Sequence, residues 1–193
     1  MRASRSWPMI ILLAGLAVAC SAPEDRESLD QASTSPAELH LADLRSTVVT
    51  LHDKFSALAE AMPEGDLAWR PMDGVRSVSE VYIHIAADNY YVPSLMGWRA
   101  PDETGVTDDV ATFRAYQDRT MSRDQMLTAL DDSFRFFLAS MEESVGALDR
   151  EVVLGSPTTV GDVWIRAVVH MHEHLGQSIA YARANSVVPP WSG

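Results

Sequence analysis

Cysteine and lysine are almost absent from this chain, and each absence excludes a kind of chemistry. The single cysteine, Cys20, cannot form an intramolecular disulfide, and the single lysine, Lys54, leaves almost no candidate for Schiff-base chemistry or lysine-based phosphate binding. Basic residues are scarce as well, because 15 Lys and Arg stand against 27 Asp and Glu, for a formal net charge of −12. Nucleic-acid-binding proteins need clustered basic side chains, so this balance argues against DNA or RNA as a partner.

A long hydrophobic run is missing too. The most apolar stretch, residues 9–19, is shorter than the ~20 residues that a helix needs to cross a bilayer. It follows Arg2 and Arg5 and ends in small residues, which is the order of the basic region, apolar region and cleavage site in a secretory signal peptide. We therefore predict that residues 1–20 are a signal peptide.

Cys20 stands directly after this apolar run. The ending LAVAC at residues 16–20 resembles a bacterial lipobox, whose cysteine is acylated and becomes the first residue of the mature protein. A lipobox usually has Leu where this chain has Ala17, so cleavage by an ordinary signal peptidase stays open. Residues 21–35 are polar and are expected to be a flexible tether. The chain is predicted to be exported and held on the bacterial envelope only by an N-terminal lipid. The alternative is a soluble secreted or periplasmic protein.

An N-capping pattern occurs four times after the tether. In each case a Ser or Thr is followed three residues later by an acid or amide, as in the capping box that opens a helix. The four pairs are Ser35 and Glu38, Ser77 and Glu80, Ser122 and Gln125, and Thr159 and Asp162. Each pair precedes a segment whose apolar residues recur every three or four positions, which is typical of a helix with one buried face. We predict helices over about residues 36–62, 78–97, 123–146 and 160–184.

These four segments indicate an all-α fold. We expect residues 36–193 to form a four-helix bundle with a long connection between helices 2 and 3. Residues 109–119 of that connection are expected to form a short extra helix, and no alternation of apolar and polar residues is long enough to predict a sheet. The apolar fraction of 47% is sufficient for one hydrophobic core. A homodimer is compatible with such a bundle, although no second apolar face requires one.

Three histidines occur at positions that favour a metal site. His170 and His174 lie about 40° apart around the fourth helix, one turn from each other, on its apolar side. His84 shares a face of the second helix with Val81 and Asp88, so it is also expected to point inward. Each histidine alone is better explained as a surface or hydrogen-bonded core residue. Together, three inward imidazoles on facing helices are costly to bury unless they bind a metal.

Imidazole nitrogens suit divalent transition metals. Zinc and nickel are the favoured ions for a site made of His84, His170 and His174, while iron and copper stay open. Asp88, one turn beyond His84, is the best-placed candidate for a catalytic acid or base. Tyr91 and Gln177 are candidates for contacts around the site.

The same residues carry a family resemblance. The chain resembles the DinB-like superfamily in three motifs: Trp69-Arg70-Pro71, then Arg76-Ser77-Val78 leading to His84, then His170-x-x-x-His174 followed by Gly176-Gln177. The resemblance implies a four-helix bundle in which three histidines hold a divalent metal and leave positions open for water. It implies His84, His170 and His174 as the ligands. Characterised members include thiol-dependent S-transferases and a maleylpyruvate isomerase that uses a small thiol.

Two classes of function follow from these features. The first is a metal-dependent hydrolase or transferase, tethered outside the cytoplasm, that acts on a small-molecule substrate with Asp88 beside the metal. An export signal departs from the cytoplasmic thiol transferases, since small thiols are scarce outside the cytoplasm. The alternative is a non-catalytic metal-binding, structural or stress-related envelope lipoprotein, which would need a fourth protein ligand and a closed site. A third possibility is a bundle that binds no metal and whose histidines are satisfied by hydrogen bonds.

Overall fold

The computed structural model describes residues 35–192. The predicted signal peptide, Cys20 and most of the predicted tether lie outside these residues. The regular elements are α1 (Pro36–Ala61), α2 (Val78–Leu95), α3 (Val110–Gln117), α4 (Arg123–Glu143), β1 (Glu151–Leu154), β2 (Ser156–Thr159) and α5 (Val160–Ala184). Short 3₁₀ turns lie at Glu64–Asp66, Asp102–Thr104 and Val145–Ala147.

The four long helices begin where the capping pattern predicts. Ser35, Ser77 and Ser122 each accept a hydrogen bond from the backbone N–H three residues on, and the acid or amide at that position accepts from the N–H of the cap. Thr159 accepts from the N–H of Asp162 and completes only half of the box. Each cap satisfies backbone donors that would otherwise lack a partner, and is worth about 1 kcal/mol. The caps therefore fix where each helix starts.

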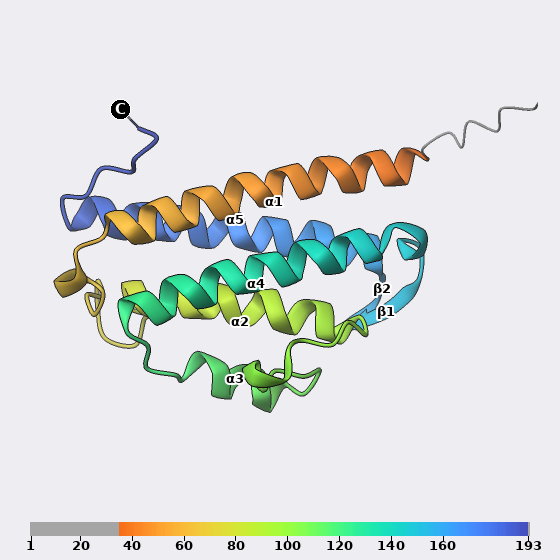
Figure 1. Ribbon diagram of the computed structural model, residues 1–193, viewed down its shortest axis with the longest axis horizontal. Helices are drawn as coiled ribbons and strands as arrows, with labels where there is room; N and C mark the ends of the chain where they lie inside the picture. The colour runs from red at the N-terminus through yellow and green to blue at the C-terminus, as the bar shows by residue number, and fades with distance from the viewer. Residues whose placement is uncertain (1–34, 193) are drawn as a thin grey trace, which may run out of the picture. The chain divides into compact units, whose positions relative to one another are not determined.

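The helices form the predicted four-helix bundle. α1 packs against α4 and α5, and α2 packs against the same two helices from the other side, as Figure 1 shows. The apolar stripe of α1 is buried in this core together with aromatic residues of the other three helices. The largest fully buried side chains include Phe55, Tyr82, Phe134, Phe137 and Trp164.

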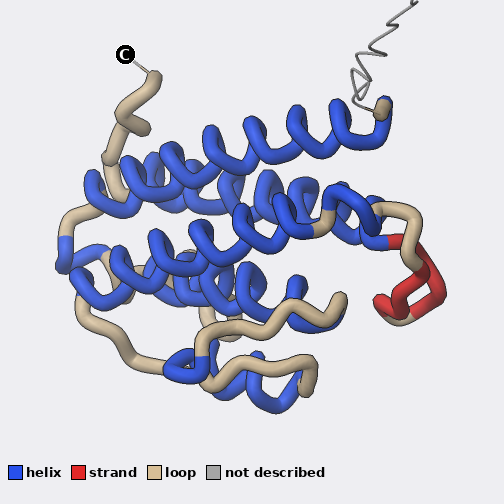
Figure 2. The backbone as a smooth tube through the Cα atoms, turned by 45° about the vertical axis from the view of Figure 1, so that its right-hand side comes forward, coloured by secondary structure: helices blue, strands red, loops and turns tan. Residues whose placement is uncertain are grey.

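The long connection between α2 and α4 holds the short helix α3, which packs on α2. Its bounds fall within the predicted residues 109–119, and Asp109 caps it by accepting from the N–H of Ala111. α3 lies outside the four-helix core, on the side of α2 (Figures 1 and 2). This placement brings the C-terminal end of α3 close to the middle of α2.

The expectation that no sheet forms is wrong in one place. β1 and β2 pair antiparallel in a small hairpin between α4 and α5, with Val152 opposite Thr158 (Figure 2). Gly155 turns the chain at φ +72°, a conformation that glycine adopts without steric cost. Strands of four residues are too short for an alternating pattern to be recognised. Within residues 35–192, no helix combines the length and apolar content needed to span a bilayer.

The capping box of α2 gives a pH prediction. Partial burial tends to raise the pKa of Glu80, but hydrogen bonds from the Ser77 N–H and from Arg70 outweigh it and hold the pKa below the usual value of 4.5. A lowered pKa stabilises the folded state above the unfolded-state pKa, and this stabilisation is lost as the pH falls through the folded-state pKa. Glu80→Gln keeps the box but loses the ion pair. We expect it to lower the free energy of unfolding at pH 7, and the difference from the wild type to shrink as the pH falls and Glu80 becomes protonated. Urea unfolding at a series of pH values is the measurement.

Candidate metal centre

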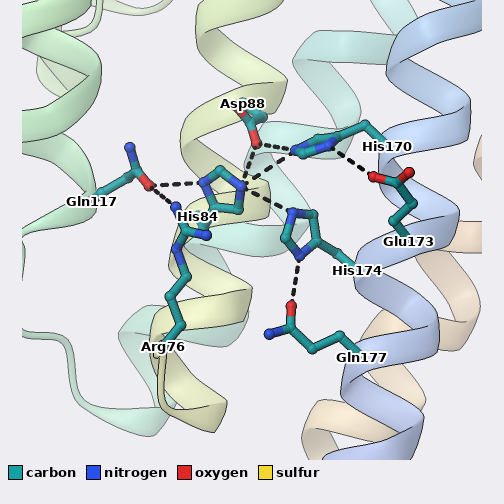
Figure 3. Close-up of polar contacts among 8 residues, drawn as sticks. All are labelled: Arg76, His84, Asp88, Gln117, His170, Glu173, His174 and Gln177. Atoms are coloured by element: carbon teal, nitrogen blue, oxygen red, sulfur yellow. Dashed lines mark hydrogen bonds and ion pairs between the residues drawn. The ribbon is translucent and has the colours of Figure 1, made fainter. Parts of the chain in front are cut away.

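Three histidine side chains from two helices meet at one point. His84 projects from α2, and His170 and His174 project from adjacent turns of α5, as Figure 3 shows. The Nε2 atom of His84 lies 3.1 Å from Nε2 of His174 and 3.3 Å from Nε2 of His170. Two ligands of a tetrahedral zinc ion, each about 2.0–2.1 Å from the metal, stand about 3.3–3.4 Å apart. The spacing is therefore that of a metal site, and the three histidines could hold a metal ion.

The site is closed on one side and open on the other. The side chain of His84 is only 7% exposed and lies against the ring of Phe113 from α3, at a centroid distance of 6.0 Å. The side chain of His170 is 41% exposed. A ligand can therefore approach from the His170 side, while His84 forms the inner wall.

Gln117 holds His84 in the tautomer that carries its proton on Nδ1. Its Oε1 lies 2.8 Å from Nδ1 of His84 and 3.0 Å from an Nη atom of Arg76. Because a guanidinium can only donate hydrogen bonds, the atom of Gln117 facing both groups is the carbonyl oxygen. His84 then donates from Nδ1, and its Nε2 lone pair points into the site.

Gln177 does the same for His174. Its Oε1 lies 2.8 Å from Nδ1 of His174, and its Nε2 donates to the hydroxyl of Tyr181 at 3.0 Å. The amide is thus held with its oxygen toward the imidazole, so His174 donates from Nδ1 and presents a lone pair at Nε2. Partners of this kind orient metal-binding histidines and fix their tautomer.

The protonation of the three histidines differs with their surroundings. Burial lowers the pKa of His84 to about 4, against the opposing effect of the Asp88 carboxylate. Burial also lowers the pKa of His174. A hydrogen bond to Asp88 raises the pKa of His170, despite partial burial. At neutral pH, His84 and His174 are neutral imidazoles, which is the form that binds metals.

Asp88 lies inside the cluster. Its Oδ2 is 3.0 Å from Nε2 of His84 and 3.1 Å from Nε2 of His170. The Nε2 lone pairs of His84 and His174 and this carboxylate oxygen all face the same small space. Acceptors that face each other at such distances repel unless a cation lies between them. The donor set therefore fits a divalent metal ion.

Most of the candidate site residues predicted from the sequence lie at the histidine cluster, and Tyr91 is the exception. His84, His170, His174 and Asp88 come together, and Gln177 is in contact with them. Tyr91 instead stacks on Phe113, with centroids 4.7 Å apart, and has no hydrogen bond to the cluster within residues 35–192. That the three histidines bind a metal, and that Asp88 is a catalytic acid or base, remain predictions.

Two residues of the site were missed by sequence reasoning. Gln117 comes from the connection between the bundle helices, and Arg76 precedes the cap of α2. Arg76 belongs to the motif Arg76-Ser77-Val78, which was a signal for the family but not for a contact. Gln117 gave no signal, because its position depends on how α3 packs on α2.

Comparison with known proteins decides the family. The sequence model of the DinB superfamily matches residues 47–178, which contain the four residues of the cluster. The chain belongs to the DinB superfamily. This membership agrees with the resemblance carried by the motifs in the sequence. A search of curated proteins found no match.

Solved structures of two DinB-like proteins share this fold. A DinB-like protein from Bacillus subtilis is 19% identical, with a TM-score of 0.56 over 75% of this chain and 92% of its own. A DinB-like protein from Bacillus cereus is 12% identical, with a TM-score of 0.64 over 77% of this chain and 95% of its own. At these identities the likeness supports the DinB fold alone.

Proposed function

We propose that this DinB protein is a divalent-metal-dependent enzyme that acts on a small molecule. The observation that carries the proposal is the convergence of the His84 and His174 lone pairs with the Asp88 carboxylate, beside the exposed side chain of His170. Acceptors in contact that are buried or partly buried are stabilised by a cation between them, and the exposure of His170 would let a substrate reach it. Zinc or nickel suits the imidazole donors best, with iron and copper as the other ions of this class.

A divalent metal bound there supplies Lewis acidity toward the oxygen or sulfur of a water molecule or substrate. The chain itself supplies orientation and a proton acceptor. Gln117 and Gln177 hold two imidazoles with their Nε2 atoms toward the space that a metal would occupy. Asp88 Oδ2, within 3.1 Å of two of the Nε2 atoms, would be placed to accept the proton of a nucleophile held beside those nitrogens. This arrangement suits hydrolysis or transfer to a nucleophile.

The place of action is part of the same proposal. The layout of residues 1–20 and the position of Cys20 support export and anchoring to the envelope by an N-terminal lipid. Small thiols are scarce outside the cytoplasm, so this location favours hydrolysis over transfer to such a thiol. Metabolic labelling with a fatty acid would separate an acylated Cys20 from ordinary cleavage.

One observation supports a second candidate. If Asp88 binds the metal as a fourth ligand, the ion is closed off and the protein is a non-catalytic metal-binding or structural protein of the envelope. The distances of 3.0 and 3.1 Å from Oδ2 to two histidine nitrogens are also those between ligands of one ion. A test must therefore separate a carboxylate that binds the metal from one that lies beside it.

The Asp88→Asn variant, loaded with cobalt, makes this separation. If Asp88 is a proton acceptor, we expect the variant to bind cobalt with nearly wild-type affinity, and azide to shift the visible absorption of both proteins. If Asp88 is the fourth ligand, the variant should lose affinity well beyond the roughly 10–100-fold cost of removing an outer partner, and azide should leave the wild-type spectrum unchanged. The second result would contradict an open enzyme site.

The role of Gln117 gives a separate prediction. Gln117→Ala leaves Nδ1 of His84 without its acceptor, so the imidazole can turn or change tautomer. We expect zinc affinity to fall about 10–100-fold, measured by competition with a chelating dye. Gln125→Ala is the control, since this glutamine caps α4 and does not contact the cluster. Equal affinities for wild type and Gln117→Ala would show that Gln117 has no part in positioning His84.

A further inference from the structure

Four arginines gather at one cleft beside the metal centre. The cleft has a volume of about 520 Å³ and lies between the segment that leads into α2 and the C-terminal end of α3. Arg70 and Arg76 line it from the first side, and Arg114 and Arg119 from the second, with Glu80 and Asp118 as the acidic side chains. In a chain with a net charge of −12, so many cations around one cleft are unusual.

The four arginines are not equally engaged. Arg70 pairs with Glu80 at 2.9 Å, and Arg119 donates to the backbone oxygen of Thr104 and lies over the ring of Tyr116. Arg76 donates to the neutral amide of Gln117, and neither it nor Arg114 has a carboxylate partner within residues 35–192. The cleft therefore contains two guanidinium groups that form no ion pair with an acid of residues 35–192.

We infer that this cleft binds the anionic group, a carboxylate or a phosphate, of a small molecule. Guanidinium groups match both oxyanions through paired N–H donors, and the volume lies in the range of small-molecule pockets. Arg76 and Arg114 are the proposed anchors, since Arg70 and Arg119 already have partners. That this small molecule is the substrate of the metal centre rests on the proposed function.

The cleft is connected to the metal centre through one side chain. Arg76 donates to Oε1 of Gln117, and the same oxygen accepts from Nδ1 of His84 (Figure 3). Because only Gln117 separates the guanidinium of Arg76 from His84, the positive charge of Arg76 opposes any cation at the histidine cluster. An anion paired with Arg76 offsets this charge. The anion and the metal are thus expected to strengthen each other's binding, by equal factors.

The first experiment measures anion binding without metal. Inorganic phosphate, and separately succinate, is titrated into the metal-free full-length protein by calorimetry at low ionic strength. We expect saturable binding of at least one of the two, weakened about tenfold or more in Arg76→Met and in Arg114→Met, as for the loss of a charge-assisted contact. Arg183→Met, which removes an exposed arginine from the last turn of α5, should bind like the wild type. Circular dichroism checks that each variant is folded.

The preferred probe identifies the anion: phosphate alone indicates a phosphate group, and succinate alone a carboxylate. Binding that is absent, or unchanged in both Arg76→Met and Arg114→Met, would overturn the inference.

A second experiment separates this inference from the proposed function. Zinc affinity is measured at nanomolar free zinc, set by a chelating buffer, with and without the anion that binds. We expect the anion to raise zinc affinity in the wild type and to leave it unchanged in Arg76→Met. Arginine-dependent anion binding by a protein that takes up no zinc, nickel, iron or copper would refute the metal enzyme and leave the anion site standing. Metal uptake without anion binding would refute the anion site and leave the proposed metal enzyme intact.

Discussion

Replacing His84 with alanine is expected to abolish metal binding by this protein. Of the three histidines, His84 alone comes from α2, so its loss leaves His170 and His174 on adjacent turns of α5. Its Nε2 is 3.1 and 3.3 Å from those of His174 and His170, so it completes the group of three imidazoles. The loss in affinity should exceed the roughly 10–100-fold cost of removing an outer partner such as Gln117. Elemental analysis of untagged protein is the measurement.

A histidine of α5 provides the matched control. His172 is exposed and its Nδ1 contacts the backbone oxygen of Val168, one turn back on its own helix. His172→Ala is therefore expected to have the same metal content as the wild type. Full metal content in His84→Ala would show that the cluster is not the binding site. Metal lost from both variants would indicate adventitious binding by histidines in general.

The helices and the main residues of the cluster could be predicted because they depend on local patterns. Ser77 and Glu80 predict the start of α2, because they form a capping box between residues only three positions apart. The spacing of His170 and His174 places both on one side of α5 whatever surrounds it. Information of this kind is present in a single segment of sequence.

The remaining parts depend on contacts between distant segments. Gln117 reaches His84 across 33 positions because α3 folds back on α2, and no periodicity encodes that packing. The arginine cleft likewise joins residues from before α2 with residues at the end of α3. In the sequence, Gln117 and these arginines look like ordinary exposed polar residues. Only the packing of α3 on α2 brings Gln117 into contact with His84 and Arg76.

The hydrophobic core supplies the second large effect, at Trp164 of α5. This side chain is fully buried and makes an edge contact with Phe137, at a centroid distance of 5.0 Å. Its Nε1–H donates to the buried hydroxyl of Ser144 at 2.9 Å, just after α4. Trp164 thus joins α5 to the end of α4 through both packing and a hydrogen bond.

Trp164→Ala is expected to lower the free energy of unfolding by about 3–5 kcal/mol, the usual cost of the cavity left by a large aromatic residue. That is a large part of the roughly 5–15 kcal/mol that stabilises a typical domain. Trp164→Phe keeps one aromatic ring but loses the donor to Ser144 and part of the buried volume, so about 1–3 kcal/mol is expected. Urea unfolding followed by circular dichroism measures both. Similar losses for the two variants would show that the phenyl ring retained in Trp164→Phe contributes little to stability, against the expected packing effect. A loss below about 1 kcal/mol for Trp164→Ala would contradict the buried position of the ring.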